Sequence, residues 1–125
     1  MTCQDAAAES RDTSNWPWYL YLLDCADGTT YTGITTDPLR RLDEHNAGRG
    51  ARYTSQRGRR PVRLLGVWRF PDQSSATRAE HRFKRRPPAR KRRLAAARVP
   101  FEGAPFCPQF LADETHSKTE LPPTP

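Results

Sequence analysis

Five side chains of this sequence are of types that can act together on a phosphodiester: Tyr21, Tyr31, Arg41, His45 and Glu80. A phenol of lowered pKa, or an imidazole, can take the proton of an attacking water. A guanidinium stabilises the charge that gathers on the phosphate oxygens in the transition state. A carboxylate can hold a hard cation such as Mg²⁺ or Mn²⁺. Because one carboxylate is well placed in the expected core helices, the sequence indicates a single metal site.

Each of these residues also has an ordinary structural explanation. A tyrosine in a strand usually serves packing, and Arg41 follows another arginine, as on a solvated helix face. His45 lies near an expected helix end, where it could interact with the helix dipole. Glu80 could pair with Lys84, four residues later. It is the order and spacing of the five residues together that favour the chemical interpretation.

The charges of the chain are placed unevenly. Residues 16–98 hold 19 Lys and Arg against 7 Asp and Glu, whereas the two flanks hold 2 against 7. A basic body with mildly acidic ends indicates a polyanionic partner, DNA or possibly RNA. Eighteen of the 21 basic residues are Arg, whose planar fork matches two phosphate oxygens, although a genome that prefers Arg codons would give the same excess. The basic residues expected to contact phosphates are Arg40, Arg49, Arg52, Arg57, Arg59, Arg60 and Lys84.

Hydrophobic runs and turn signals predict the elements that must position these side chains. The run WPWYLYLLDC is typical of a buried strand, and Asp27-Gly28 predicts a hairpin turn into a second strand at TTYTGI. Asp37-Pro38 is expected to open a helix that carries Leu39 and Leu42 inward and ends near Gly48. This half of the chain therefore predicts two strands followed by a helix.

The second half predicts one more strand and two more helices. The basic stretch GRGARYTSQRGRRP is expected to be a loop, and PVRLLGVWRF a third strand. Ser74 or Ser75 is expected to cap a helix with Ala76 and Phe83 on one apolar face, and Pro88 to begin a short final helix. The order strand, strand, helix, strand, helix, helix predicts an α/β domain with a small, three-stranded, mostly antiparallel sheet flanked by helices.

This arrangement predicts where the chemical side chains meet. The hairpin brings Tyr31 back towards Tyr21, and Gly33 leaves space above the sheet in which a phosphate could approach the backbone. Arg41 and His45 are four residues apart, so they lie on one face of the helix that follows. With the carboxylate of the next helix, these groups are expected to surround one surface hollow.

The chain is expected to form one domain over residues 16–98. Residues 1–15 are polar and without periodicity, so we expect a disordered leader, and residues 99–125 hold six of the twelve prolines, so we expect a flexible tail. Apolar side chains between residues 101 and 111 leave open that part of this tail docks onto the body.

Cysteine usage and hydropathy bear on the compartment. The three cysteines are odd in number and never spaced C-x-x-C, which argues against a disulfide framework or a structural zinc site. There is no apolar run of the length that a membrane span needs. The expectation is a cytoplasmic protein without membrane contact, a monomer or weak dimer.

The order of the chemical residues resembles the GIY-YIG nuclease domain. Tyr19-Leu20-Tyr21 takes the place of the first motif and Tyr31-Thr32-Gly33 that of the second. Small stand-alone bacterial members of this family (UPF0213-like) are related to structure-specific endonuclease catalytic subunits and to the amino-terminal domain of excinuclease C. They similarly read W-Y-x-Y-x-L-x-C-x-D-G, Y-T-G-I-T, R-R-x-x-x-H-N and A-x-Y-T. The resemblance covers residues 16–97.

The resemblance implies metal-dependent cleavage of one DNA strand per site, with Mg²⁺ or Mn²⁺ at a single site. It makes Tyr21 and Tyr31 the two motif tyrosines, and we expect Tyr21 to be the general base. His45 would assist it, Arg41 would be the helix arginine, and Glu80 would be the metal ligand.

The resemblance also places Tyr53 along the DNA groove, and it has departures. The first motif lacks its Gly and Ile, with Tyr19 and Leu20 in their places, and Thr32 replaces the Ile of the second. Pro87-Pro88 replaces the more usual Leu-Ser at the last helix boundary. These changes leave the expected base and metal ligand intact.

Three functions compete at this point. The first is an endonuclease that acts in DNA repair or recombination, or on branched or single-stranded DNA, with a protein partner possible for targeting. The second is a nucleic-acid-binding module of the same fold that cleaves weakly or not at all. The third, a ribosome-associated basic protein, fits the charge alone. Glu80 and the paired tyrosines favour the enzyme, because binding alone needs neither.

Overall fold

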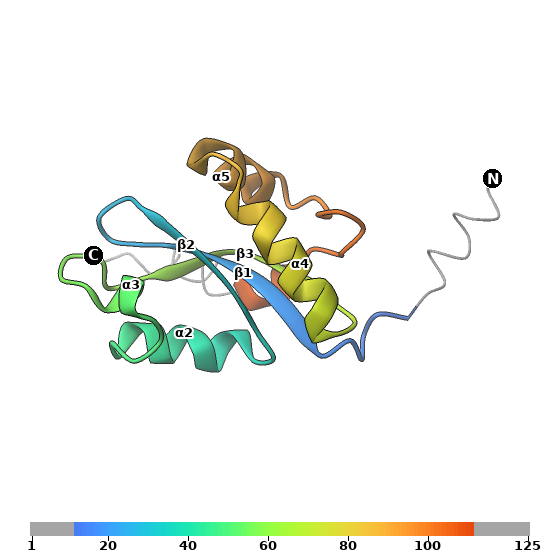
Figure 1. Cartoon of the computed structure of the whole chain (residues 1–125), viewed down its shortest axis with the longest axis horizontal. Coiled ribbons are helices and arrows are strands. Elements are labelled where there is room, and N and C mark those ends of the chain that lie inside the picture. Colours follow the sequence, from blue (N-terminus) through green and yellow to red (C-terminus); the bar gives the residue numbers. More distant parts are fainter. Residues whose placement is uncertain (1–11, 112–125) are drawn as a thin grey trace.

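The computed structural model describes residues 12–111 of the chain (Figure 1). Its sheet has three antiparallel strands in the order β2-β1-β3, and α2 and α3 lie on one side of it with α4 and α5 on the other (Figure 1). The predicted α/β class and three-stranded antiparallel sheet are confirmed. The elements are β1 (Trp18–Asp24), β2 (Thr30–Thr35), α2 (Pro38–Asn46), α3 (Arg52–Ser55), β3 (Arg63–Phe70), α4 (Gln73–Lys84), α5 (Pro88–Ala97) and a 3-10 turn, η1 (Pro108–Leu111).

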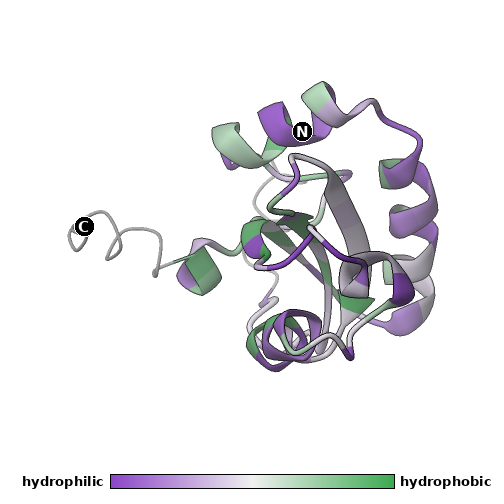
Figure 2. Cartoon of the chain, turned by 90° about the vertical axis from the view of Figure 1, so that its left-hand side faces the viewer, coloured by the Kyte–Doolittle hydropathy of each residue, from purple (hydrophilic) through white to green (hydrophobic). Residues whose placement is uncertain are grey.

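Side chains of the central strand β1 alternate between two hydrophobic clusters. Leu20 and Leu22 pack with the apolar face of α4, whereas Tyr19, Tyr21 and Leu23 pack on the opposite side of the sheet. In Figure 2, α4 lies on the right and is mostly hydrophilic in colour. The residues of α4 that are buried against the sheet are its few apolar ones, Ala76, Ala79 and Phe83. The predicted division of β1 into two faces agrees with this packing.

The turn between β1 and β2 forms where Asp27-Gly28 predicts it. Gly28 has a φ of +89°, a conformation that glycine adopts without strain. The Asp27 carboxylate accepts hydrogen bonds from the backbone N–H and the hydroxyl of Thr29, at 3.1 and 2.6 Å. The resulting register places Tyr21 directly opposite Gly33. This pairing creates the candidate site.

The helix after β2 also begins and ends as predicted. The Asp37 side chain accepts from the backbone N–H of Arg40, Pro38 occupies the first turn, and the helix stops just before Gly48, whose φ is +84°. The prediction that Leu39 points inward is wrong, because this side chain is 47% exposed. Leu42 does pack against the tyrosine side of the core.

Two further local predictions need correction. The cap of α4 is Asp72, whose side chain accepts from the backbone N–H of Ser75 at 2.8 Å, and not Ser74 or Ser75. The basic stretch between α2 and β3, predicted to be a loop throughout, contains the four-residue helix α3. The Asp72 cap is a local contact with Ser75, whereas α3 depends on contacts with the rest of the fold that local periodicity does not reveal.

The segment from Phe101 to Leu111 is packed and not a free tail. Phe101 joins the cluster under α4, whereas Cys107 and Leu111 join the tyrosine side, so the segment passes around the edge of β3. Along that edge the Arg69 N–H donates to Pro105 and the Cys107 N–H donates to Val67. The docking of part of the tail, which the sequence left open, is thus seen for residues 101–111. Residues 1–11 and 112–125 lie outside the described residues. Within residues 12–111, no helix has the length and apolar character that a membrane span requires.

Candidate active site

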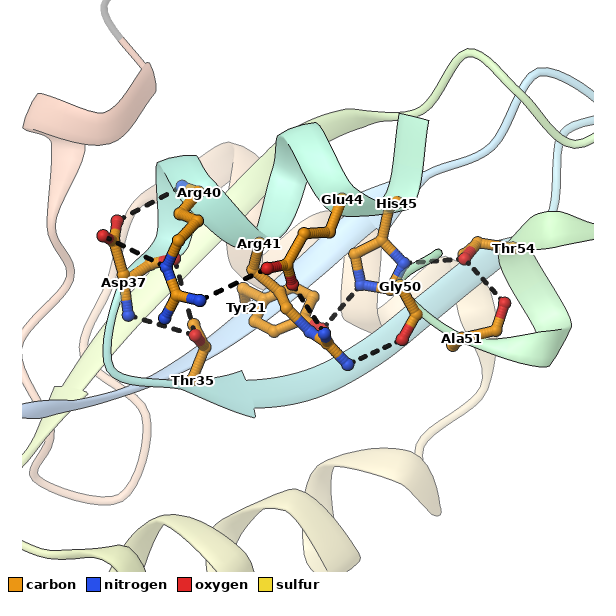
Figure 3. A network of polar contacts seen from close by, with 10 residues as sticks. All are labelled: Tyr21, Thr35, Asp37, Arg40, Arg41, Glu44, His45, Gly50, Ala51 and Thr54. Carbon is orange, nitrogen blue, oxygen red and sulfur yellow. Dashed lines mark hydrogen bonds and ion pairs between the residues drawn. The ribbon is translucent and has the colours of Figure 1, made fainter. Parts of the chain in front are cut away.

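A buried tyrosine–histidine pair forms the centre of the candidate site (Figure 3). The Tyr21 hydroxyl lies 2.8 Å from Nε2 of His45, and the Tyr21 side chain is 2% exposed. Tyr21 comes from the central strand and His45 from the last turn of α2, 24 residues later. The spacing of Arg41 and His45 on α2 does place both against this phenol, as predicted.

Gly33 is required by Tyr21 rather than by a substrate. A Cβ atom at residue 33 would lie 2.5 Å from the Tyr21 hydroxyl oxygen and 2.8 Å from the ring carbon that carries it. The phenol therefore occupies the space that the sequence reserves for a phosphate. That prediction is wrong, and the reason is that the strand register places the two residues face to face.

The hydrogen-bond chain through His45 fixes its tautomer. Nδ1 of His45 lies 2.6 Å from the hydroxyl of Thr54, and that hydroxyl donates to the carbonyl of Ala51 at 3.3 Å. The hydroxyl must therefore accept from Nδ1–H, which leaves Nε2 as an acceptor. The Tyr21 hydroxyl consequently donates a hydrogen bond to Nε2 and keeps its proton. The resting pair is a neutral phenol on a neutral imidazole.

Burial keeps both members of this pair neutral. The pKa of His45 falls to about 4, mainly because of burial; the nearby Arg41 charge adds to the fall and Glu44 opposes it. Burial also raises the pKa of the Tyr21 phenol well above its ordinary value, and the neighbouring Arg41 guanidinium offsets only part of this rise. His45 is therefore not placed as a helix-dipole contact on the surface.

Arg41 is held in place at the rim of the site. Its Nη1 donates to Glu44 at 2.8 Å and its Nη2 donates to the carbonyl of Gly50 at 2.6 Å (Figure 3). The hydrogen bond that Arg41 donates to Glu44 also raises the pKa of Arg41. A guanidinium has five N–H donors, and the Tyr21 phenol accepts from a third, so two remain for a ligand. Arg41 is thus fixed in direction but still able to bind an anion.

Tyr31 is more accessible than Tyr21. It is partly buried, and its ring centroid lies 5.2 Å from that of His45 and 6.3 Å from that of Tyr21. Tyr53 stacks on it at 5.7 Å with an interplanar angle of 28°. Among the described residues, the Tyr31 hydroxyl has no hydrogen-bond partner. The phenol of Tyr31 is therefore available to solvent or substrate.

Glu80 comes to the site from α4, on the other side of the sheet. Its side chain is 17% exposed and lies 3.1 Å from the ammonium of Lys84. Its charge is close enough to add to the raised pKa of Tyr21, after the larger effect of burial. Residues 12–111 contain no cluster of three or more metal-ligating side chains. One carboxylate still fits Mg²⁺, which keeps several waters and commonly takes one or two carboxylates together with substrate phosphates.

The basic residues expected to bind DNA fall into two groups. Arg59 turns inward, where it contacts Asp27 and Tyr53, and Arg40 pairs with Asp37 and Glu44 although it stays exposed. The second group is exposed and surrounds α3: Arg49, Arg52, Arg57 and Arg60. Lys84 is half exposed beside Glu80. The exposed group remains a predicted contact surface, whereas the bonds of Arg59 favour an internal role.

Sequence reasoning missed three residues of the site. Thr54 holds His45, Glu44 holds Arg41, and Gly50 accepts from Arg41 while leaving no room for a Cβ beside the His45 ring. The spacing of Arg41 and Glu44, three residues apart on a helix, could have indicated their ion pair. The A-x-Y-T stretch that ends in Thr54 is part of the family resemblance, but no local pattern predicts that its threonine bonds to His45.

Comparison with known protein families identifies the family of this chain and agrees with the α/β fold. The pattern of the GIY-YIG catalytic domain matches residues 17–93. The chain therefore belongs to the GIY-YIG catalytic domain family, a family of nucleases.

Within that family it is similar to UPF0213 proteins. It is 54% identical over 74 residues to one from Cupriavidus pinatubonensis, and this match covers 59% of this chain and 80% of the relative. It is 43% identical over 100 residues to one from Desulfotalea psychrophila, which covers 79% of this chain and 89% of the relative. The solution NMR structure of a UPF0213 protein from Bacillus halodurans is 41% identical, with a TM-score of 0.42, and covers 69% of this chain and 90% of that one. None of these names states an activity.

Proposed function

We propose that the protein is a metal-dependent endonuclease that hydrolyses phosphodiester bonds in DNA, one strand per site. The observation that carries the proposal is the convergence of Tyr21, Tyr31, Arg41 and His45 on one rim beside the edge strand β2. A surface that only binds nucleic acid has no need of a buried phenol–imidazole pair next to a fixed guanidinium. The family supports hydrolysis as the reaction class.

In this proposal Arg41 stabilises the charge of the transition state. Glu44 and the carbonyl of Gly50 hold the guanidinium, so its free N–H donors keep one direction before substrate arrives. Preorganised donors of this kind need no rearrangement as negative charge grows on the phosphate oxygens. Replacing such a donor typically costs a factor of about 10²–10³ in rate.

We assign the general base to Tyr31 instead of Tyr21, the residue expected from the sequence. Tyr21 is almost fully buried and already donates its proton to His45. Loss of that proton would create a phenolate and an imidazolium in a dry site, which burial disfavours. Tyr31 lies on the same rim and is partly exposed, so its oxygen can accept a proton from an attacking water once its own proton has passed to solvent. Tyr21 and His45 then support the rim on which Arg41 and Tyr31 act.

Glu80 would hold Mg²⁺ or Mn²⁺, which when bound supplies the charge that polarises a phosphate oxygen. The carboxylate of Glu80, whose side chain is 17% exposed, pairs with the ammonium of Lys84 at 3.1 Å beside the site. With a cation on Glu80, the half-exposed Lys84 would be free to contact a phosphate. This exchange ties the metal ligand to one of the predicted DNA contacts.

We also propose a cytoplasmic location, a role in DNA repair or recombination, and targeting by a partner protein. Cys25 and Cys107 are free and buried, which suits a reducing compartment. No stretch of the sequence resembles a helix that reads base edges, so preference for a DNA site would come from elsewhere.

The test is cleavage of labelled single-stranded, nicked, flapped and four-way-junction DNA by the purified chain. Reactions contain Mg²⁺, Mn²⁺ or EDTA, and the variants are Tyr31→Phe, Tyr21→Phe and Glu80→Ala. We expect metal-dependent cutting that Glu80→Ala and Tyr31→Phe reduce by at least about 10²-fold, while binding in EDTA is retained. Tyr21→Phe is expected to slow the reaction less, because it removes support and not the base.

A second candidate function is a nucleic-acid-binding module that does not cleave. The exposed arginines around α3 favour it as much as they favour the enzyme. Tight binding without cutting of any DNA or RNA substrate, with any of the metals, would support this candidate and contradict the nuclease. Cutting that survives Glu80→Ala would remove that residue as the metal ligand.

A further inference from the structure

Two adjacent residues of α3 reach two different rings of the site. Tyr53 stacks on Tyr31, with 5.7 Å between centroids, and Thr54 accepts from His45 across 2.6 Å. The helix is only four residues long, and no side chain caps its amino end. A single helical turn is not stable by itself. Something outside α3 must therefore hold it at the distance that these two contacts require.

Arg59 makes that connection. Its Nη1 donates to the backbone carbonyl of Tyr53 at 3.1 Å, and its guanidinium carbon lies 3.8 Å from the centroid of the Tyr53 ring. Its Nε donates to Asp27 at 3.1 Å, and its own carbonyl accepts from the N–H of Ala26 at 3.0 Å. The side chain is 21% exposed, so these contacts occupy most of its surface. One arginine thus joins α3 to the β1–β2 turn.

The other end of this connection is itself rigid. Besides Arg59, the carboxylate of Asp27 accepts two hydrogen bonds from Thr29 within the turn. These bonds, those from Thr29 first, hold the pKa of Asp27 below its ordinary value, so it remains a carboxylate at neutral pH. This β1–β2 turn leads directly into β2, which carries Tyr31. The path from Arg59 therefore reaches Tyr31 from both sides, through the turn and through Tyr53.

We infer that Arg59 is a positioning residue of the active site, which locks α3 to the β1–β2 turn so that Tyr53 orients Tyr31 and Thr54 orients His45. The inference rests on the proposed nuclease function. It reassigns both Arg59 and Tyr53, which the sequence placed among the DNA contacts. The arginine acts through its geometry and not through its charge towards a phosphate.

Arginine is suited to this task in a way that lysine is not. Arg59 donates in two directions from one rigid plane and lays that plane over an aromatic ring. A lysine ammonium is a point charge on a flexible stem, so it can satisfy one of these partners but not all three. Arg59→Lys therefore removes the lock and conserves the charge, which separates positioning from phosphate binding.

The experiment compares Arg59→Lys with Arg93→Lys, a matched change at an exposed arginine of α5 outside the site. Single-turnover cleavage is measured with Mg²⁺, and DNA affinity is measured in EDTA at several salt concentrations. We expect Arg59→Lys to slow cleavage by at least about 10-fold, a small misplacement of reacting groups being enough for such losses. Its Kd and salt slope should match the wild type, and Arg93→Lys should change neither rate nor affinity.

Tyr53→Leu supplies a second variant on the same path. It should slow cleavage as Arg59→Lys does, and the double variant should be no slower than Tyr53→Leu alone, because both changes break one connection. A wild-type cleavage rate in Arg59→Lys overturns the inference. So does a fall in rate that follows a weaker Kd and a flatter salt slope, since that result makes Arg59 a phosphate contact.

A readout without cleavage separates this inference from the proposed function. In NMR spectra of the 14.3 kDa chain, the stacked Tyr31 and Tyr53 rings should show nuclear Overhauser contacts. We expect Arg59→Lys to abolish these contacts and to shift the His45 ring signals, while Arg93→Lys leaves both unchanged. If the wild type cuts no substrate, the nuclease proposal fails, but persistence of the ring contacts in Arg59→Lys still overturns the positioning role.

Discussion

His45 illustrates how the surroundings of one residue decide what it can contribute. In water this side chain would titrate near neutral pH. Here it is buried between a phenol that donates to it and a hydroxyl that accepts from it, and its pKa falls to about 4. It therefore stays neutral across the physiological range. Its hydrogen bond positions the Tyr21 phenol, and it does not exchange protons with solvent in this range.

The lowered pKa of His45 predicts a pH-dependent stability. As pH falls below about 6.5 the unfolded chain binds a proton at this histidine, but the folded chain does not until about pH 4. The stability that neutral His45 contributes to the folded state is therefore fully present above pH 6.5 and is lost as pH falls towards 4. On acidification from pH 7.5 to 5.0 we expect the free energy of unfolding to fall by about 2 kcal/mol because of His45.

Urea unfolding of the wild type and of His45→Asn at these two pH values measures this effect. The variant lowers stability at both values because Tyr21 loses its partner. It should nevertheless lose about 2 kcal/mol less than the wild type on acidification. Equal acid losses in the two proteins would mean that His45 is not held neutral by the fold.

At the scale of elements, two short segments without strong secondary structure complete the fold. The α3 turn supplies Tyr53 and Thr54 to the site, and the segment from Phe101 to Leu111 covers the edge of β3. Edge strands expose unpaired backbone groups, and a covering segment protects them. Asn46 assists by bonding both backbone groups of Val62, at 2.7 and 3.0 Å, which closes the loop that contains α3.

The packed carboxy-terminal segment predicts the effect of Phe101→Ala. The Phe101 ring is buried and meets the rings of Phe83 and Trp68 edge-on, with centroids 5.1 and 6.4 Å away. Removing it should lower the free energy of unfolding by about 3 kcal/mol or more, since a large buried ring is replaced by a cavity. Chemical denaturation measures this change, and Val99→Ala, at an exposed position nearby, serves as the control. A loss below about 1 kcal/mol would show that the segment does not fold with the sheet.

For the molecule as a whole, exposed arginines and the proposed catalytic residues are arranged around β2. Exposed arginines surround α3 on one side of the sheet, whereas α5 carries Arg90 and Arg93 on the other side. Because the proposed site opens beside α2 and α3, we expect DNA to pass over the α3 side. The arginines of α5 would then lie away from this path.

Salt dependence of DNA binding tests that path. Replacing Arg49, Arg52 and Arg57 together with Gln should weaken binding and make the slope of log Kobs against log salt less negative by up to about 3, because each lost phosphate contact changes it by about 0.9. Arg90→Gln with Arg93→Gln is the matched control on α5. If the α5 variant flattens the slope and the α3 variant does not, the DNA runs over the opposite side of the sheet.

The sequence by itself determined the local features of this protein. Alternation along β1, the Asp27-Gly28 turn, the Asp37-Pro38 helix start and the four-residue spacing of Arg41 and His45 all depend on neighbouring residues, and the structure contains each of them. The family also follows from such features, because its motifs are short and continuous.

Only the tertiary structure decided which distant residues complete the site. Tyr21 and His45 are 24 residues apart, Asp27 and Arg59 are 32 apart, and Gly33 meets Tyr21 through the strand register. The stretch containing α3 has no hydrophobic period, and the prolines around Phe101 conceal a packed segment. Such contacts depend on how the elements pack and not on local propensity. For that reason the sequence predicts that Arg59 contacts a phosphate, whereas in the structure its side chain contacts Asp27 and Tyr53.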